Sequence, residues 1–301
     1  MKVCKFGGTS LANAEQVAKI VDIVLADPSR RIVVVSAPGK RTKDDIKVTD
    51  LLIACAELAL VDGDCEAVLA TIVERYAEIQ RELGLPPGIT AEIEKDLRFR
   101  LAGDKSHRGI FMDSMKAAGE DNSAKLVAQA FQSRGARATY MNPQDAGMYL
   151  TNDYGNAQLL EESYQHLAKT LVGHDELVIF PGFFGYTKEG QVATFPRGGS
   201  DITGSILAAA VKASVYENFT DVDSVYPVDP RLVPEVKTGI PAMTYREMRE
   251  LSYAGFGVFH DEAVVPAIKA GVPINVRNTN RPDEPGTMIV QSRRVLAGCV
   301  V

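Results

Sequence analysis

The first 36 residues constrain the fold of this chain more than any other segment. KVCKF at 2–6 has strand character and is followed at once by Gly7-Gly8. Residues 14–26 then carry apolar side chains at helical spacing, which predicts an amphipathic helix. The continuous apolar run at 31–36 is typical of a strand that is buried on both faces of a parallel sheet. Strand, glycine turn, helix and buried strand in this order predict a βαβ unit.

The rest of the chain continues this alternation. Residues 48–133 are rich in good helix formers, which predicts a helical layer and insertion over the sheet. Further strands are expected at 136–141, 177–180, 191–195, 215–219 and 273–277, and further helices at 157–172 and 202–213. The predicted fold class is α/β, a three-layer αβα sandwich with a mostly parallel central sheet.

Composition and charge exclude several classes of protein. The net charge of −6 opposes nucleic-acid binding, which needs a clustered basic face, and no tryptophan is present for base or sugar stacking. No stretch approaches the roughly 20 apolar residues that a membrane helix needs, and the N-terminus has no signal-peptide run. The four cysteines form no CxxC pair, so a zinc site or a disulfide framework is not expected. We therefore expect a cytoplasmic protein without nucleic-acid or membrane partners.

The first motif that can carry chemistry is KFGGTS at 5–10. Lys5 leaves the end of a buried strand, and Gly7 and Gly8 precede a helix. Glycines let backbone N–H groups approach phosphate oxygens, and a lysine supplies a full charge where a phosphoryl group moves. The lysine precedes the glycines, so this is not a Walker A loop. By itself the motif fits phosphate binding and a plain strand-to-helix turn about equally well.

The second motif, TFPRGGSD at 194–201, repeats this design at another helix start. Arg197 suits a bidentate contact with a carboxylate, and Asp201 can cap the helix or hold an ammonium group. Serine and aspartate are also common N-cap residues, so a capped helix after a glycine turn is the alternative. Two Gly-Gly loops of opposite charge, each after a strand, favour a site for an anionic substrate between them.

Three other segments are less specific. TDVDSVYPVDPR at 220–231 has the acids, tyrosine and arginine of a surface for ribose, adenine and Mg-phosphate, but a turn-rich solvated loop has the same composition. GEDNS at 119–123 precedes a helical run, and its acids are expected to cap that helix and meet its dipole. The mixed charges at 40–47 are typical of a solvated loop.

Together these motifs resemble the aspartokinases of the amino acid kinase family, over nearly the whole chain. Further carriers of the resemblance are VVVSAP at 33–38, VTDLL at 48–52, GFFG at 182–185, YAGFGVFHDEAVVPA at 253–267 and VRNTNRPDEPGT at 276–287. The resemblance implies the amino acid kinase fold and transfer of the γ-phosphate of MgATP to the β-carboxylate of L-aspartate. The product would be 4-phospho-L-aspartate, which begins the synthesis of lysine, threonine, methionine and diaminopimelate. ATP and Mg²⁺ are the implied cofactors, and a homodimer is the implied assembly.

The resemblance also implies roles for individual residues. Lys5 would stabilise the phosphoryl group during its transfer, and Asp201 would hold the side chain of this lysine in place. The substrate aspartate would be bound by Ser36, Thr49, Glu120, Phe183, Arg197, Gly198, Gly199, Ser200 and Asp201. ATP would be bound by Lys5, Gly7, Gly8, Thr9, Ser10, Thr220, Asp221, Tyr226, Asp229 and Arg231. Gly257 stands where many family members have a lysine that often contacts the nucleotide.

The implied substrate agrees with the charges of these residues. A zwitterionic amino acid needs one cation for its α-carboxylate, here Arg197, and about two anions for its α-ammonium, here Glu120 and Asp201. A carboxylate nucleophile is already ionised at pH about 7, so no general base is required. A uridylate or carbamate substrate has no amino group for the acidic pair.

The domain organisation follows from the extent of these motifs. One kinase unit is expected over 1–290, with an aspartate-binding lobe at about 1–195 and an ATP-binding lobe at about 196–290. Residues 291–301 are expected to be a tail or the start of an ACT region, which aspartokinases commonly carry to bind feedback amino acids. The expected unit therefore lacks a feedback sensor of its own.

Two other classes of function remain as alternatives. A non-enzymatic family member would bind nucleotide or amino acid without turnover, against which the intact charged residues argue. A purely structural α/β interaction module would leave the two charged Gly-Gly loops unexplained.

Overall fold

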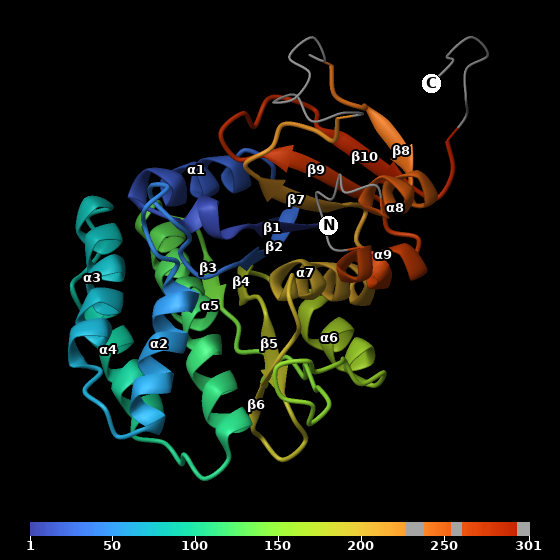
Figure 1. The fold of residues 1–301 in the computed structure, drawn as a ribbon. Coiled ribbons are helices and arrows are strands. Elements are labelled where there is room, and N and C mark those ends of the chain that lie inside the picture. Colours follow the sequence, from blue (N-terminus) through green and yellow to red (C-terminus); the bar gives the residue numbers. More distant parts are fainter. Residues whose placement is uncertain (227–237, 254–260, 294–301) are drawn as a thin grey trace.

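The apolar runs of the sequence form one large sheet with helices on both faces in a computed structural model of the chain (Figure 1). The structure describes residues 1–226, 238–253 and 261–293. The strands are β1 Lys2–Phe6, β2 Arg30–Val35, β3 Ala138–Tyr140, β4 Leu177–Pro181, β5 Phe184–Tyr186, β6 Val192–Thr194, β7 Tyr216–Thr220, β8 Ala242–Thr244, β9 Ile274–Asn278 and β10 Thr287–Val290. The helices are α1 Ala14–Leu25, α2 Val48–Leu60, α3 Glu66–Glu82, α4 Gly88–Leu101, α5 Arg108–Ser133, α6 Ser163–Leu171, α7 Gly199–Ala210, α8 Tyr245–Tyr253 and α9 Val265–Lys269, with 3₁₀ turns at Gly8–Leu11 and Asp261–Val264.

The order of the strands confirms the predicted fold class. Within the described residues, the large sheet runs β3-β4-β2-β1-β7-β9-β10-β8. Neighbouring strands are parallel except for the antiparallel pair β9 and β10. β5 and β6 form a separate antiparallel hairpin. The central sheet is therefore mostly parallel, and the predicted βαβ unit is β1, α1 and β2.

The side chains of β2 show why the sheet needs helices on both faces. Val33 and Val35 join one core with residues of α1 to α5, whereas Ile32 and Val34 join a second core with residues of α6, α7 and α9. A strand that is apolar on both faces is stable only between two layers. Figure 1 shows these layers, with α1 to α5 on one side of the sheet and α6, α7 and α9 on the other.

The boundaries differ from the sequence prediction in several places. The helix expected over 157–172 begins only at Ser163, because the preceding residues pair with other segments: the Ala157 N–H donates to the Thr194 carbonyl at 3.0 Å. β5, β8 and β10 were not predicted, and the strand expected at 191–195 lies in the hairpin outside the large sheet. Strands of three or four residues are too short for a clear alternation of apolar and polar side chains.

The parallel strands bring four loops to one edge of the sheet. β1, β2, β4 and β7 all end there, so Gly7, Ser36, Gly182 and Asp221 follow strands that end side by side. The chain passes from β1 to β2 on one side, while β7 pairs with the other side of β1. Ligands of open α/β sheets bind at such a switch point, outside the carboxyl ends of the strands.

A buried cluster of charges joins β7 to the strands around it. Glu217 is 1% exposed and accepts hydrogen bonds from Arg30 at 2.6 and 3.1 Å, from Arg277 at 3.2 Å and from Lys2 at 3.3 Å. The Cys4 thiol donates to the same carboxylate at 3.3 Å. Burial alone would raise the pKa of Glu217, but the hydrogen bonds and charge of Arg30 hold it below its usual value. The ionised form of Glu217 therefore stabilises the folded sheet.

Replacing Glu217 with glutamine should destabilise the fold by about 3 kcal/mol near neutral pH, because the buried guanidinium groups lose their counter-charge. Chemical denaturation measures this free energy. The pKa of Glu217 is lowered by folding, so the stabilisation is present above the unfolded value of 4.5 and is lost as the pH falls below it. The cost of the substitution should therefore shrink in acid. Glu66→Gln, which removes an exposed ion pair with Arg98, should cause no resolvable change, and an equal loss in both variants would contradict the assignment.

Candidate active site

Lys5 and Asp201 form an ion pair between the sheet and a helix. The Lys5 Nζ lies 2.7 Å from the Asp201 Oδ1, and both side chains are largely buried. The cap of α7 is Gly198, in a left-handed conformation with φ of +82°, and Asp201 lies in the first turn. Neither Ser200 nor Asp201 is the N-cap, so the Asp201 carboxylate is available to the lysine.

The ion pair lines a pocket of about 210 Å³ at the carboxyl edge of the sheet. The pocket draws residues from the end of β1, the loop after β2, the first turn of α2, the middle of α5, the loop after β4 and the start of α7. Its lining is Lys5, Ser36, Thr49, Glu120, Phe183, Gly198, Gly199, Ser200 and Asp201. All of them except Lys5 are residues that the resemblance assigned to aspartate, so side chains that are far apart in the sequence share one small cavity.

Glu120 gives this pocket a buried carboxyl group. It is 6% exposed, and its Oε2 has no hydrogen-bond partner among the described residues. Burial raises the pKa of Glu120 to about 8, although the Ala37 backbone and the charge of Lys5 oppose the shift. An unpartnered carboxylate in a cavity is stabilised by a cation of the ligand, such as an ammonium group.

The neighbouring residue, Asp121, points into a different network. It accepts from Arg100 at 2.7 Å and from Lys125 at 2.9 Å, and the Tyr140 hydroxyl also donates to it. The expected helix cap at 119–123 is wrong, because α5 begins at Arg108 and carries these acids in its buried middle. Arg100 of α4 and Tyr140 of β3 donate hydrogen bonds to Asp121, so this acid can be buried inside the helix.

The loop after β4 fixes the shape of the pocket at Phe183. Phe183 has a φ of +76°, and its N–H donates to the Thr203 Oγ1 at 3.0 Å. A Cβ on Gly199 would lie only 2.4 Å from the Phe183 Cδ2, so the start of α7 can approach this loop only as glycine. Strained backbone of this kind persists where the surroundings hold it, and it clusters at functional sites.

The glycine turn after β1 leaves space beside the Lys5 ammonium. A Cβ on Gly7 would lie 3.5 Å from the Lys5 Nζ, and one on Gly8 would lie 3.1 Å from the Ala37 carbonyl oxygen. The Gly8 carbonyl accepts from the Gly39 N–H at 2.8 Å, and the Gly39 carbonyl accepts from Arg75 at 2.6 Å. The loop at 40–47 is mostly exposed, as expected, but Arg75 anchors its start and thereby supports the glycine turn.

The residues expected to bind ATP are spread more widely. Thr9 and Asp221 are exposed, Thr220 and Tyr226 are half-buried, and Ser10 is 1% exposed with its hydroxyl 2.7 Å from that of Thr279. Thr220 ends β7 beside β1, so part of this set lies next to the glycine turn. Asp229 and Arg231 of this set lie outside the described residues, and so does Gly257.

Arg197 is the predicted substrate contact that the structure leaves outside the pocket. Its side chain is exposed, and it forms no ion pair with any other residue that the structure describes. It directly precedes Gly198, which does line the cavity. Asn218, in contrast, was not predicted, yet its amide donates to Asp201 at 2.6 Å. The available signal was an amide in a predicted strand, between the aromatic residues Tyr216 and Phe219.

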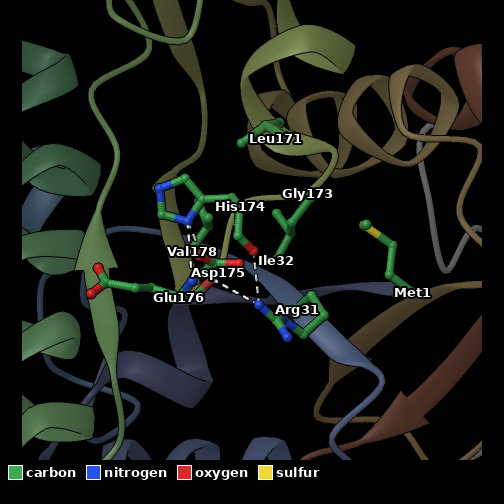
Figure 2. Close-up of a pocket in the computed structure, with 9 residues that line it drawn as sticks. All are labelled: Met1, Arg31, Ile32, Leu171, Gly173, His174, Asp175, Glu176 and Val178. Atoms are coloured by element: carbon green, nitrogen blue, oxygen red, sulfur yellow. Dashed lines mark hydrogen bonds between the residues drawn. The ribbon is translucent and has the colours of Figure 1, made fainter.

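A second cavity, of about 260 Å³, lies at the opposite edge of the sheet, near the starts of β1, β2 and β4. Figure 2 shows Arg31 directed at the loop before β4, where its Nη2 donates to the carbonyls of His174 at 2.8 Å and Glu176 at 3.4 Å. Because the guanidinium is occupied by backbone carbonyls, it holds the loop in place. None of the predicted site residues that lie within 1–226 lines this cavity.

Comparison with known proteins agrees with this arrangement. Residues 1–278 match the model of the amino acid kinase family. The chain is 55% identical to Aspartokinase 3 of Bacillus subtilis over its whole length, and covers 66% of that protein. A crystal structure of Clostridium acetobutylicum aspartate kinase matches 99% of the chain with a TM-score of 0.87 and 35% identity, and 65% of that chain is covered. The structure of Escherichia coli aspartokinase III in complex with aspartate and ADP matches with a TM-score of 0.85 and 28% identity, over 98% of this chain and 65% of that one.

The chain spans about two thirds of the length of these relatives. In the part of the chain that the structure describes, no helix is both long enough and apolar enough to cross a membrane. The family match covers most of the sequence, including both Gly-Gly loops and the pocket between them. This chain belongs to the amino acid kinase family.

Proposed function

We propose that this chain is an aspartate kinase catalytic unit, which transfers the γ-phosphate of MgATP to the β-carboxylate of L-aspartate and forms 4-phospho-L-aspartate. The observation that carries the proposal is the small pocket in which the Lys5–Asp201 ion pair lies with the buried Glu120 carboxyl. The similarity to the Bacillus and Clostridium aspartate kinases supports the same substrate. The product begins lysine, threonine, methionine and diaminopimelate synthesis.

The chemistry requires positioning and charge neutralisation. One β-carboxylate oxygen forms a bond to the γ-phosphorus, the bond to the oxygen that bridges to the β-phosphate breaks, and that oxygen leaves with ADP. The attacking carboxylate is ionised at pH about 7, so no proton has to be removed from it. Lys5 neutralises negative charge on the phosphoryl oxygens while they move, and Asp201 holds the lysine at the edge of the pocket.

The pocket suits the charged groups of an amino acid. Glu120 and Asp201 would bind the α-ammonium, with Ser36 and Thr49 as neutral partners in the same pocket. Arg197 would bind the α-carboxylate, which requires its exposed side chain to turn toward Gly198. A phosphate substrate without an amino group would leave the Glu120 carboxyl unpaired.

The glycine turn provides room for the phosphates of ATP. The Cβ position of Gly7, 3.5 Å from the Lys5 Nζ, lies where a phosphate oxygen would contact the ammonium. Mg²⁺ would come with ATP and neutralise phosphate charge, and it commonly takes most of its ligands from phosphates and water. Among the described residues, no group of three or more His, Cys, Asp or Glu side chains is placed to hold a metal ion by itself.

A substrate-panel assay tests the proposal. The purified chain is incubated with MgATP and L-aspartate, and aspartyl hydroxamate is measured after trapping with hydroxylamine. Hydroxamate should form with L-aspartate and not with L-glutamate or N-acetylglutamate. Turnover of one of those two instead would assign the chain to a sister kinase. Calorimetric binding of aspartate or nucleotide without turnover would support the non-enzymatic alternative.

The same proposal assigns the two substrates to different parts of the chain. Residues from about 1 to 195 would form the aspartate-binding lobe and those from about 196 to 290 the ATP-binding lobe, with the pocket drawing on both. The homodimer stays a prediction.

A further inference from the structure

Asn218 is a buried amide in the middle of β7 whose hydrogen bonds are directed at the active site. Only 1% of the residue is exposed, and burying an unpaired amide is costly. Its Nδ2 donates to the Asp201 Oδ1 at 2.6 Å and to the Tyr216 hydroxyl at 3.2 Å. The Tyr216 hydroxyl in turn donates to the backbone carbonyl of Asp201 at 3.2 Å. Asn218 and Tyr216 therefore hold both the side chain and the backbone of Asp201.

The register of the sheet explains how this contact arises. β1 and β7 are parallel neighbours in which Lys5 lies opposite Asn218, so the two side chains leave the sheet on the same face. The Asp201 Oδ1 accepts the Asn218 amide at 2.6 Å and lies 2.7 Å from the Lys5 ammonium. One carboxylate oxygen is thus fixed by donors from two adjacent strands. Asn218 itself does not line the pocket.

We propose that Asn218 is a positioning residue for phosphoryl transfer, which fixes the Asp201 carboxylate so that the Lys5 ammonium stays at the point where the phosphoryl group passes. This inference rests on the proposed kinase function. A neutral donor suits the position because it adds no charge: a cation would compete with Lys5 for Asp201, and a second carboxylate would repel it. With the amide in place, Asp201 keeps its orientation when the ammonium turns toward the phosphoryl oxygens.

The first variant removes the amide. Asn218→Leu keeps the approximate volume and removes the amide donor from the Asp201 carboxylate, which keeps its contact with Lys5. Its kcat should fall by about 10- to 100-fold, because a displacement of a reacting group by up to about 1 Å has an effect of this size. The KM for MgATP should change less than about threefold, because Asn218 is argued to act on the transferred group and not on nucleotide affinity. A kcat within about twofold of the unmodified chain would overturn the inference.

The second variant separates positioning from a purely structural role. In Asn218→Asp the introduced carboxyl can share one proton with Asp201 at low pH, and an O–H donor then replaces the amide. At high pH the two carboxylates repel each other, which moves the Asp201 carboxylate, and with it the paired Lys5 ammonium, away from the position for transfer. The kcat relative to the unmodified chain should therefore be about tenfold higher at pH about 6 than at pH about 9. A ratio that is constant over this range would overturn the inference, and this isosteric variant keeps the test available if Asn218→Leu fails to fold.

A control and a separate readout complete the experiment. Asn275→Asp places a carboxylate on the neighbouring strand β9. Asn275 lies opposite Glu217, so its side chain leaves the sheet on the face opposite to that of Asn218. The kcat of this variant relative to the unmodified chain should not depend on pH.

Acylation of Lys5, read by mass spectrometry at pH about 9, should be slower in Asn218→Asp by about threefold, because the added negative charge keeps the ammonium protonated. An unchanged acylation rate would overturn the inference even without kinase turnover. Absence of turnover in the unmodified chain together with slowed acylation would instead remove the proposed function and leave the coupling of Asn218 to Lys5 standing.

Discussion

Replacing Lys5 with methionine should lower the kcat for phosphorylation of aspartate by about a thousandfold, because the variant lacks the positive charge that lies beside the transferred phosphoryl group. Methionine keeps most of the aliphatic stem, which is buried at the end of β1, so the fold should be retained. A charge that acts mainly in the transition state lowers kcat and kcat/KM together. Steady-state hydroxamate assays with varied aspartate and varied MgATP measure both constants.

The control for this prediction is the same substitution at Lys19. That lysine lies on α1, where it pairs with Glu15 on the surface, and its loss should leave kcat unchanged. If Lys5→Met retained near-normal turnover, Lys5 would have no role in the transfer, and its pairing with Asp201 would be structural only. Circular dichroism and thermal unfolding of both variants distinguish a lost catalytic charge from a lost fold.

Replacing Glu120 with glutamine should raise the KM for aspartate by about 100-fold and leave the KM for MgATP nearly unchanged. One oxygen of this buried carboxyl has no partner among the residues that the structure describes, so a substrate ammonium is its natural counter-charge. Loss of one partner of a buried, hydrogen-bonded charge pair costs about 3 kcal/mol, which corresponds to that factor. Steady-state kinetics with aspartate varied at saturating MgATP measures the change.

The pKa of Glu120 adds a dependence on pH that the variant should lose. Burial raises this pKa to about 8, so the empty pocket holds a neutral carboxyl at lower pH and must release a proton when the ammonium binds. The KM for aspartate should therefore fall as the pH rises toward about 8, and then level off. In Glu120→Gln the KM should be flat across this range. Asp121→Asn, one residue further along α5, should reduce stability through the Arg100 network but keep the pH dependence, and a flat profile in that variant would contradict the assignment.

The same raised pKa makes a prediction about the empty protein. Folding raises the pKa of Glu120 from 4.5 to about 8, so the folded state binds the extra proton between these values and loses stability as the pH rises through them. Glu120→Gln removes this loss. The variant should therefore unfold at a higher temperature than the unmodified chain at pH about 8, although it binds aspartate far more weakly.

The sequence allows much of the framework to be predicted, because its signals are local. The apolar runs at β1, β2 and β7, and the glycines after β1, follow from periodicity and turn chemistry alone. The position of Glu120 does not, since GEDNS has the composition of a helix start and is tolerated inside α5 only through partners on other elements, such as Arg100 and Tyr140. Asn218 was missed for a related reason: its role depends on the register between β1 and β7, which no local pattern specifies. The outward placement of Arg197 likewise depends on the conformation of one loop.

The central position of β1 has a consequence for how the protein is made. β1 pairs with β2 on one side and with β7 on the other, although β7 is synthesised long after β2. A nascent chain therefore carries an open parallel strand edge while the helical insertion and the hairpin leave the ribosome, and contacts of such long sequence separation form slowly. The second edge of β1 stays uncovered until Tyr216–Thr220 has been synthesised. The Lys5 ammonium can pair with Asp201 only after α7, Gly199–Ala210, has also been synthesised and packed against β1.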